Sequence, residues 1–346
     1  MKVNADELRQ AFKSVDRVPQ QATLLASQYV KAVAEKKRLS LYLGGIVSAR
    51  ASVPCDEDKT FYVERKILSS FLANASDEVT ITAMDSKVTL KSGRSKIEAA
   101  QPEPSQYSIW VPKKDAVEVD IDPAVIKFIA TFTSTNPGDE HLEAAQLIKG
   151  FGVVASDSFS VAACLDKRVS VDGALPRLLT RCVGQNDEEK LLMELGGAGL
   201  RGKSGWLYQP LTVADKPFPL KPVQEMIKKA LAQQPVMMVK GVALSDGIRY
   251  LQSFAYGGGN FEVQCLPAKN GVSLLMETPT AKADCIVEAS KVKLPKEAMW
   301  PLTPVAVWVD KMKEYDLTIG TWDDTYFSFV AKAEEQTHVL IVVRRQ

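Results

Sequence analysis

The chain is poor in histidine and has no clustered cysteine. Its two histidines, His141 and His338, are too few for a histidine-centred catalytic triad or a multi-histidine metal site. The five cysteines are widely scattered and form no C-x-x-C pair, so the sequence predicts neither a zinc site nor a disulfide framework. We therefore expect no metal, no cofactor and free, mostly buried thiols.

Long apolar runs are absent as well. No stretch approaches the ~20 consecutive apolar residues that a membrane-spanning helix needs. The segment Met1–Asp6 is polar and lacks the apolar core of a secretion signal. With 46% hydrophobic and 25% charged residues, the composition is that of an ordinary globular protein. These features predict a cytoplasmic protein with no membrane partner.

No motif for catalysis or nucleotide binding is complete. The glycines Gly257–Gly259 are not followed by Lys-Ser/Thr, and the cluster Gly196–Gly199 lies between strand-like stretches instead of opening a helix. The carboxylate runs Asp187–Glu189 and Asp323-Asp324 fall in expected turns, where a solvated loop is the simpler interpretation. Nothing assembles a nucleophile, a base and an oxyanion site. We predict a non-enzyme, with a hydrolase that uses loop carboxylates as the alternative.

What the sequence does contain is a pattern that recurs three times: a helix-like stretch, paired strands, a second helix-like stretch and a closing hairpin. The helix-like stretches span 6–18, 64–75, 122–134, 174–184, 222–233 and 302–314, and the hairpins start near Glu78, Glu189 and Tyr315. The period is roughly 100–125 residues, the size of one domain. Two proline-rich stretches, 100–116 and 210–222, separate the repeats. We predict an α+β protein of three similar domains, 1–115, 116–218 and 219–346, each with two helices packed on antiparallel sheets.

Two further expectations concern the third domain. Between its two helices, we expect strands from Val236 to Cys265. Its last apolar run, Val339–Val343, is typical of a buried strand.

Cations recur on the helix-like stretches. Arg9, Lys13 and Arg17 are four residues apart, so they line one helix face that differs from the apolar face. The six stretches together are mildly basic, whereas the rest of the chain is mildly acidic. Basic helix faces can attract phosphates without reading bases. The alternative interpretation is a set of solvated helix faces.

Four short stretches carry a resemblance to a known family. They are Ser92-Gly93-Arg94-Ser95-Lys96-Ile97, Val154–Ala162, Pro217-Phe218-Pro219 and the apolar-then-basic end Val339–Arg345. In this order they resemble bacterial-type DNA sliding clamps, the DNA polymerase III beta subunit family, which has Ser-Gly-Arg-Ser, Ala-Thr-Asp-Gly-His-Arg-Leu-Ala and Arg-Phe-Pro at matching places. The Gly-His-Arg portion is missing here, and Ile97 replaces an aromatic residue. We identify the chain as similar to a divergent clamp, one encoded by a bacteriophage.

The resemblance implies a processivity factor that acts as a ring-shaped, head-to-tail homodimer. Such a ring encircles double-stranded DNA without sequence preference and binds a DNA polymerase and a clamp loader, here in the bacterial cytoplasm of a phage-infected host. The implied DNA-facing cations are Arg9, Lys13, Arg17, Arg94, Lys96, Lys127, Arg177, Arg181, Lys221, Lys228 and Lys229, and for Arg94 and Lys96 a structural role is the alternative. The implied walls of a partner-peptide pocket are Phe159, Val161, Pro219, Val339 and Ile341, with a plain apolar core as the alternative. A structural or assembly protein of repeated β domains, without DNA encirclement, is the remaining alternative.

Overall fold

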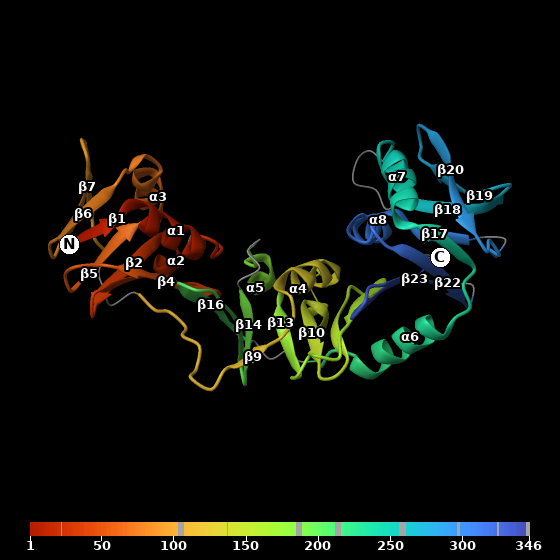
Figure 1. Cartoon of the computed structure of the whole chain (residues 1–346), viewed down its shortest axis with the longest axis horizontal. Coiled ribbons are helices and arrows are strands. Elements are labelled where there is room, and N and C mark those ends of the chain that lie inside the picture. Colours follow the sequence, from red (N-terminus) through yellow and green to blue (C-terminus); the bar gives the residue numbers. More distant parts are fainter. Residues whose placement is uncertain are drawn as a thin grey trace. The chain divides into compact units, whose positions relative to one another are not determined.

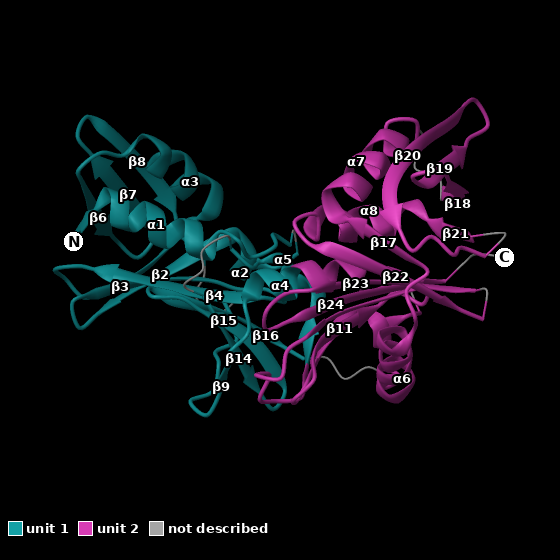
Figure 2. Cartoon of the chain, turned by 45° about the vertical axis from the view of Figure 1, so that its right-hand side comes forward, with its two compact units in different colours: residues 1–127, 174–213 teal, residues 128–173, 214–346 magenta. Residues whose placement is uncertain are grey.

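The computed structural model describes residues 1–21, 23–102, 107–136, 138–184, 189–211, 216–255, 261–295, 298–323 and 325–343. The chain forms two compact units (Figure 2): unit 1 is Met1–Lys127 with Ala174–Val213, and unit 2 is Phe128–Gly173 with Ala214–Gln346. Both units are built from antiparallel sheets with helices packed on them, which confirms the predicted α+β class (Figure 1). The glycines Gly257–Gly259, the carboxylates Asp187, Glu188 and Asp324, and the terminal Arg344 and Arg345 lie outside the described residues.

Unit 1 contains a four-stranded sheet in the order β1-β6-β7-β8 and an eight-stranded sheet in the order β5-β2-β3-β4-β16-β15-β14-β9. Its elements are β1 (Lys2–Asn4), α1 (Ala5–Val15), α2 (Leu25–Gln28), β2 (Tyr29–Glu35), β3 (Arg38–Leu43), β4 (Ser48–Pro54), β5 (Lys59–Glu64), α3 (Arg65–Asn74), β6 (Glu78–Ala83), β7 (Lys87–Ser92), β8 (Ser95–Ala100), β9 (Val117–Val119), the start of α4 (Pro123–Ile129), most of β13 (Gly173–Pro176), α5 (Arg177–Arg181), β14 (Lys190–Glu194), β15 (Gly197–Arg201) and β16 (Gly205–Pro210).

Strands of unit 2 follow the order β10-β11-β12-β24-β23-β22-β17-β20-β19-β18-β21. Its elements are the 3-10 turns η2 (Ala130–Phe132) and η3 (Glu140–Leu142), β10 (Ala144–Ile148), β11 (Gly152–Ser156), β12 (Ser160–Leu165), α6 (Leu220–Ala232), β17 (Met237–Lys240), α7 (Gly241–Gln252), β18 (Glu262–Ala268), β19 (Gly271–Glu277), β20 (Lys282–Ser290), β21 (Ala298–Pro301), α8 (Leu302–Lys311), β22 (Asp316–Trp322), β23 (Tyr326–Lys332) and β24 (Thr337–Val343).

Helix α1 shows how local sequence sets an element and its packing. The side chain of Asn4 accepts hydrogen bonds from the backbone N–H groups of Asp6 and Glu7, which caps the helix start. Leu8 and Phe12 are buried one turn apart, so the apolar stripe of the helix packs on β3 and β4. Lys13 lies on a different stripe of the helix and is exposed, whereas Arg9 is half-buried.

The sheet of unit 2 is covered by helices on both faces. Val339 and Ile341 on β24 join a buried cluster with Val223 and Ile227 of α6. Val330 on β23 belongs to the same cluster. Because neighbouring residues of a strand point to opposite faces, the residue before Val330 faces away from α6.

That residue is Phe329, and it packs against α8. Its ring centroid is 6.3 Å from that of Trp308 on α8, and Leu340 lies directly opposite it on β24. Helices α7 and α8 pack on each other, so both lie on the face away from α6 (Figure 1). Of the helices described in unit 2, α6 therefore lies on one face of the sheet, and α7 and α8 lie on the other.

The structure corrects the expected strands between Val236 and Cys265. Strand β17 ends at Lys240, the chain then forms helix α7 over Gly241–Gln252, and β18 begins at Glu262. Leu244, Ile248 and Leu251 are buried at helical spacing, which is the signal that the prediction missed.

Two helices expected in the second repeat are shorter than predicted. The expected helix 122–134 ends as α4 at Ile129 and continues as a 3-10 turn, and the first residues of 174–184 form β13 before α5 begins at Arg177. The helices expected at 64–75 and 302–314 and the buried strand Val339–Val343 are confirmed, and the helix expected at 6–18 forms but ends at Val15, so Arg17 lies beyond it.

The predicted domain boundaries at 115 and 218 stay predictions. The eight-stranded sheet joins strands from the first and second predicted domains, through β4 and β16. The sheet of unit 2 joins strands from the second and third, through β12 and β24. The two compact units therefore divide the second predicted domain between them.

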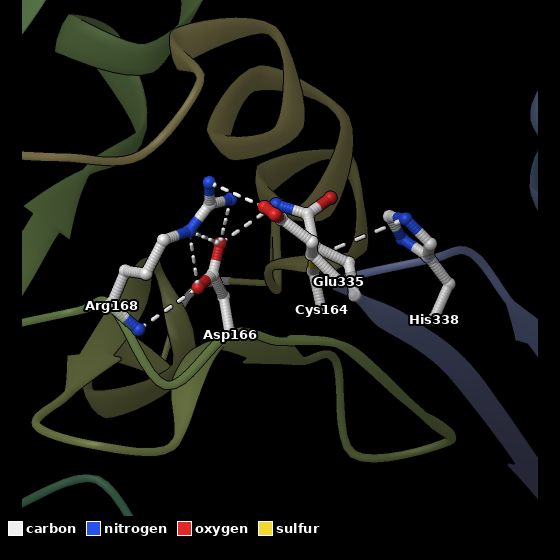
Figure 3. A network of polar contacts seen from close by, with 6 residues as sticks. Cys164, Asp166, Arg168, Glu335 and His338 are labelled. Atoms are coloured by element: carbon white, nitrogen blue, oxygen red, sulfur yellow. Dashed lines mark hydrogen bonds and ion pairs between the residues drawn. The ribbon is translucent and has the colours of Figure 1, made fainter.

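A polar network ties the end of β12 to the β23–β24 hairpin in unit 2 (Figure 3). Arg168 donates to both carboxylate oxygens of Asp166 and to Glu335 at 2.9 Å, and the amide of Gln336 donates to Asp166 at 2.8 Å. The guanidinium of Arg168, with the Gln336 amide, lowers the pKa of the buried Asp166 carboxyl to about 2. Nearby, His338 lies 4.0 Å from the Cys164 sulfur, and burial lowers the pKa of its imidazole.

We predict that Asp166→Asn lowers the free energy of unfolding by about 2 kcal/mol near neutral pH. The folded-state pKa of about 2 lies below the ordinary value of 3.8, so the unfolded chain takes up the proton first. The stabilisation is therefore complete above pH ~4 and is lost as the pH falls toward 2. Urea unfolding at pH 6 and pH 3 measures it. The exposed Glu335→Gln is the matched control, and an equal deficit of Asp166→Asn at both pH values would contradict the assignment.

Candidate nucleic-acid interface

Helix α1 and its neighbours bring several predicted cations together in unit 1. The Cys182 thiol donates to the carbonyl oxygen of Arg17 at 3.3 Å, so the end of α5 lies beside the end of α1. The ammonium of Lys127 donates to the carbonyl oxygen of Val183 at 2.9 Å. Three elements distant in sequence therefore meet at the C-terminal end of α1, and each carries a predicted cation.

Two arginines, one on each helix, connect α1 and α3. Arg9 on α1 donates to the carbonyl oxygens of Leu72 at 2.9 Å and Ala75 at 2.6 Å, at the end of α3. Arg65 on α3 donates to the carboxylate of Asp16 at 2.6 Å, just after α1 ends. Cations are favourable at helix C-termini, where carbonyl groups are left unpaired. Arg9 is thus committed to a structural contact.

We define the basic cluster as Lys13, Arg17, Lys66, Lys127 and Arg181. Arg17 forms an ion pair with Glu189, while the side chains of Lys13, Lys66 and Arg181 are exposed. Lys66 was missed by the sequence analysis, although it follows Arg65 at the start of an expected helix. Arg177 is half-buried at the first position of α5. Among the described residues, which leave out Asp187 and Glu188, the five cations have Glu189 as their one acidic partner, so the cluster favours an anionic, extended ligand.

The remaining predicted cations of unit 1 are not on helices. Arg94 lies in the tight β7–β8 turn, where Gly93 adopts a φ of +55°. Lys96, on β8, is 2.8 Å from Glu98 in an exposed ion pair. Both belong to the four-stranded sheet, so they do not join the basic cluster.

The three predicted cations of α6 are also separate. Lys221 and Lys228 are exposed, and Lys229 forms an ion pair of 2.7 Å with Asp323 while lying 5.6 Å from the Trp322 ring centroid. Because α6 covers the sheet face opposite to α7 and α8, these lysines do not share a surface with those helices. Their placement gives no support to a common role with the basic cluster.

The predicted pocket residues have different environments. Val161, Val339 and Ile341 belong to the buried cluster under α6, and the last two are 0% exposed. Pro219 directly precedes α6 and is half-buried. Phe159, in the β11–β12 turn, is 44% exposed. Of these five side chains, Phe159 is the one most open to a partner.

The described residues give little support for catalysis or for metal binding. Burial raises the pKa of the Cys182 thiol to about 11, so this cysteine is a poor nucleophile. The described part of the chain holds no group of three or more side chains suited to a metal ion. Among the described helices, none is both long and apolar enough to cross a membrane. The property of this site that can bind a ligand is the positive charge of the basic cluster.

Comparisons with known proteins identify the fold. No protein-family model matches the sequence, and no curated protein matches it. The structure is similar to the DNA polymerase sliding clamp of Bacillus subtilis, with a TM-score of 0.83 and 12% identity over 100% of this chain and 98% of that one. The clamp of Pseudomonas aeruginosa gives 0.81 and 14%, covering 100% and 99%. The DNA polymerase III beta subunit of Thermotoga maritima gives 0.78 and 11%, also covering 100% and 99%. The chain therefore has the sliding-clamp fold over its full length, as the resemblance predicted.

We predict that Ile341→Ala lowers the free energy of unfolding by about 2–5 kcal/mol, because it leaves a cavity in the buried cluster under α6. Phe159→Ala removes a larger but exposed side chain, so its cost should stay under about 1 kcal/mol. Urea denaturation of both variants measures the difference. Equal, small effects would mean that α6 does not cover Ile341 in solution.

Proposed function

We propose that this protein is a DNA sliding clamp, a ring that encircles double-stranded DNA and tethers a DNA polymerase to it. The observation that carries the proposal is the basic cluster of unit 1, which gathers cations from four helices on a chain with the sliding-clamp fold. Phosphate contacts of this kind hold DNA without reading its sequence, which is what a sliding ring requires. The chain then acts by binding and enclosure, without catalysis.

Ring closure as a head-to-tail homodimer is supported by two strand edges. Strand β8 is the last strand of its sheet among the described residues and pairs with β7. Strand β20 pairs with β17 through Ala289 and Ser290 alone, so one edge of the 282–288 part has no strand beside it in the described residues. Open edges of this length invite pairing with another chain, and closing a ring removes them.

The two edges offer unlike charges at several positions, and each also holds an ion pair of its own or with a neighbouring strand, Lys96 with Glu98 and Lys282 with Glu277. Arg94 and Lys96 precede or begin β8, while Asp284 and Glu288 are exposed on β20. Ile286, between these carboxylates, is 69% exposed and needs an apolar partner. Pairing β8 of one protomer with β20 of the next would cover this isoleucine and oppose unlike charges. This gives Arg94 and Lys96 a role at the subunit interface instead of on DNA.

The same proposal includes the finer expectations of the resemblance. The ring would work in the bacterial cytoplasm, with a polymerase and a clamp loader as its protein partners, and the three-domain division at 115 and 218 would describe its repeating unit. A bacteriophage origin remains part of the proposal, supported by the divergence of the sequence alone.

Replacing Lys13 and Arg181 with Ala should weaken duplex DNA binding and flatten its salt dependence. The slope of log affinity against log salt concentration should fall by up to about 2 per protomer, because each lost phosphate contact removes about 0.9. Fluorescence anisotropy on a circular or end-blocked duplex measures this. Lys221→Ala with Lys228→Ala removes two lysines from α6 and is the matched control. An unchanged slope in the Lys13/Arg181 variant would exclude the basic cluster as the DNA contact.

Reversing two charges on β20, Asp284→Lys with Glu288→Lys, should convert the dimer to a monomer. Native mass spectrometry measures the change directly. Adding Arg94→Glu and Lys96→Glu to the same chain should restore the dimer, because the edges are again complementary. A dimer that survives the reversal, or a shell of many copies in the parent protein, would contradict this interface.

A further inference from the structure

Seven strands of the eight-stranded sheet in unit 1 contribute one side chain each to a continuous row. Directly paired residues of neighbouring strands point to the same face of a sheet, so the pairing register determines which side chains belong to the row. From β5 to β14, its members are Tyr62, Lys31, Tyr42, Arg50, Trp206, Arg201 and Lys190. Aromatic and cationic side chains alternate over the first six members, so we call it the aromatic–cation row.

The aromatic–cation row lies on the sheet face that the helices of unit 1 leave uncovered. Helix α1 packs on the buried apolar residues of β3 and β4, and Tyr42 and Arg50 alternate with these residues, so both point away from α1. On β16, Gln209 accepts a hydrogen bond from the backbone N–H of Leu179 in α5 at 2.9 Å, so Trp206 points away from α5. Figure 2 shows α1 and α5 on the same side of this sheet. The row and the helices that carry the basic cluster are therefore on opposite faces.

One end of the row is closed and the other is open. Tyr62 is buried, and its ring centroid is 5.4 Å from that of Tyr107, which also lies 5.9 Å from the ammonium of Lys31. The remaining five members are half-buried or exposed and form the open stretch of the row: Tyr42, Arg50, Trp206, Arg201 and Lys190. The open stretch spans four strand spacings, or ~19 Å.

The open stretch carries more positive charge than its own contacts neutralise. The guanidinium of Arg50 lies 5.6 Å from the Tyr42 ring centroid, and Arg50 forms no ion pair within the part of the chain that the structure describes. Arg201 and Lys190 share the carboxylate of Glu118, at 3.2 and 3.3 Å. Three cations therefore have one acidic partner, which lies beside the row on β9.

Three other carboxylates of the strands lie on the same face but outside the row. Glu194 accepts hydrogen bonds from the Tyr208 hydroxyl and, at 2.7 Å, from the backbone N–H of Lys113. Glu35 and Glu64 are on β2 and β5, the two strands of the closed end. The open stretch itself contains no carboxylate, so its rings and cations are available to an anionic ligand.

Alternating rings and cations match the chemistry of a single nucleic-acid strand. Its unpaired bases present flat faces that stack on aromatic side chains, and a phosphate follows each base. The bases of a duplex are already stacked on one another, so a duplex offers phosphates without free base faces. The rings of Tyr42 and Trp206 therefore favour a single strand over a duplex.

We propose that the open stretch of the aromatic–cation row binds single-stranded DNA, on the sheet face opposite to the basic cluster. Tyr42 and Trp206 stack on bases, and the three cations contact phosphates, so binding is independent of sequence. The choice of DNA over RNA rests on the proposed function, since a clamp that tethers a polymerase works beside unpaired template DNA. The row itself does not depend on that function.

Fluorescence anisotropy of a labelled oligo(dT) of about twelve nucleotides, titrated with the full chain, tests the proposal. Trp206→Ala should weaken binding about tenfold, whereas Trp206→Phe keeps a ring that stacks and should bind nearly as the parent does. Arg50→Gln with Arg201→Gln should lower the slope of log affinity against log salt concentration by about 1.4, because each lost contact with a single strand removes ~0.7. The charge variant keeps the test independent of the packing that Trp206 provides.

The matched control is Lys13→Ala/Arg181→Ala, which removes two cations from the opposite face and should bind oligo(dT) as the parent does. The proposal is wrong if oligo(dT) does not bind at low salt, if both row variants bind it unchanged, or if the Lys13/Arg181 variant is the one that loses it. Tighter binding of oligo(rU) than of oligo(dT) would overturn the choice of DNA. Failure of the proposed function would look different, because the Lys13/Arg181 variant would then leave duplex binding unchanged whatever the oligonucleotides show.

Discussion

The structure of unit 2 depends on one strand that is buried on both faces. The central residues of β24, from Val339 to Val342, are each 0% exposed, and β24 lies between β12 and β23 in the sheet. A strand with no solvent-facing side requires a cover on each face of its sheet. Helix α8 supplies one cover, through the ring of Trp308 on Phe329, and α6 supplies the other, through Val223 and Ile227. The placement of the lysines of α6 follows from this requirement.

The sequence predicted this strand correctly, yet it did not predict which helix covers which face. An uninterrupted apolar run indicates burial on both sides but carries no information about the identity of either neighbour. Helix 222–233 was predicted, with helix 302–314, to be one of the two helices of the third domain, and its lysines were expected to face DNA. Tertiary packing places the two helices on opposite faces of the sheet. Val339 and Leu340 of β24 are adjacent in sequence, yet Val339 faces α6 and Leu340 faces the side of α8.

Helix α7 was missed for a physical reason that the structure makes visible. Its sequence contains Gly241 and Gly247, and glycine lowers helix propensity by about 1 kcal/mol relative to alanine. A Cβ atom on Gly247 would lie 2.6 Å from a methyl carbon of Val287 on β20 and 3.3 Å from the Cys285 sulfur. Gly247 lowers the helix propensity of this segment, and its missing side chain also allows α7 to pack closely on β20. The helical pattern in the sequence is therefore weakened by a residue that a contact with a distant strand requires.

The cations on α1 and just after it show the same limit for the candidate site. Arg9, Lys13 and Arg17 have equal spacing, and the sequence assigned them one role. In the structure Arg9 binds the carbonyl groups that end α3, Arg17 pairs with Glu189, and Lys13 is exposed. The residues that bind the two arginines are distant in sequence. The spacing of the cations therefore could not predict which of them bind other parts of the protein and which are exposed to solvent.

Charge is also distributed unevenly between the two helix layers. The basic cluster lies entirely in unit 1, whereas α7 and α8 of unit 2 carry one ion pair, between Arg249 and Asp310, and expose Val242 and Tyr250. Their other two charges, on Asp246 and Lys311, are of opposite sign, so the two helices carry no net charge. Under the function proposed above, attraction to the duplex would therefore act mainly through the basic cluster of unit 1. Such an arrangement suits sliding, because contacts limited to part of the ring are few enough to be remade as the duplex moves.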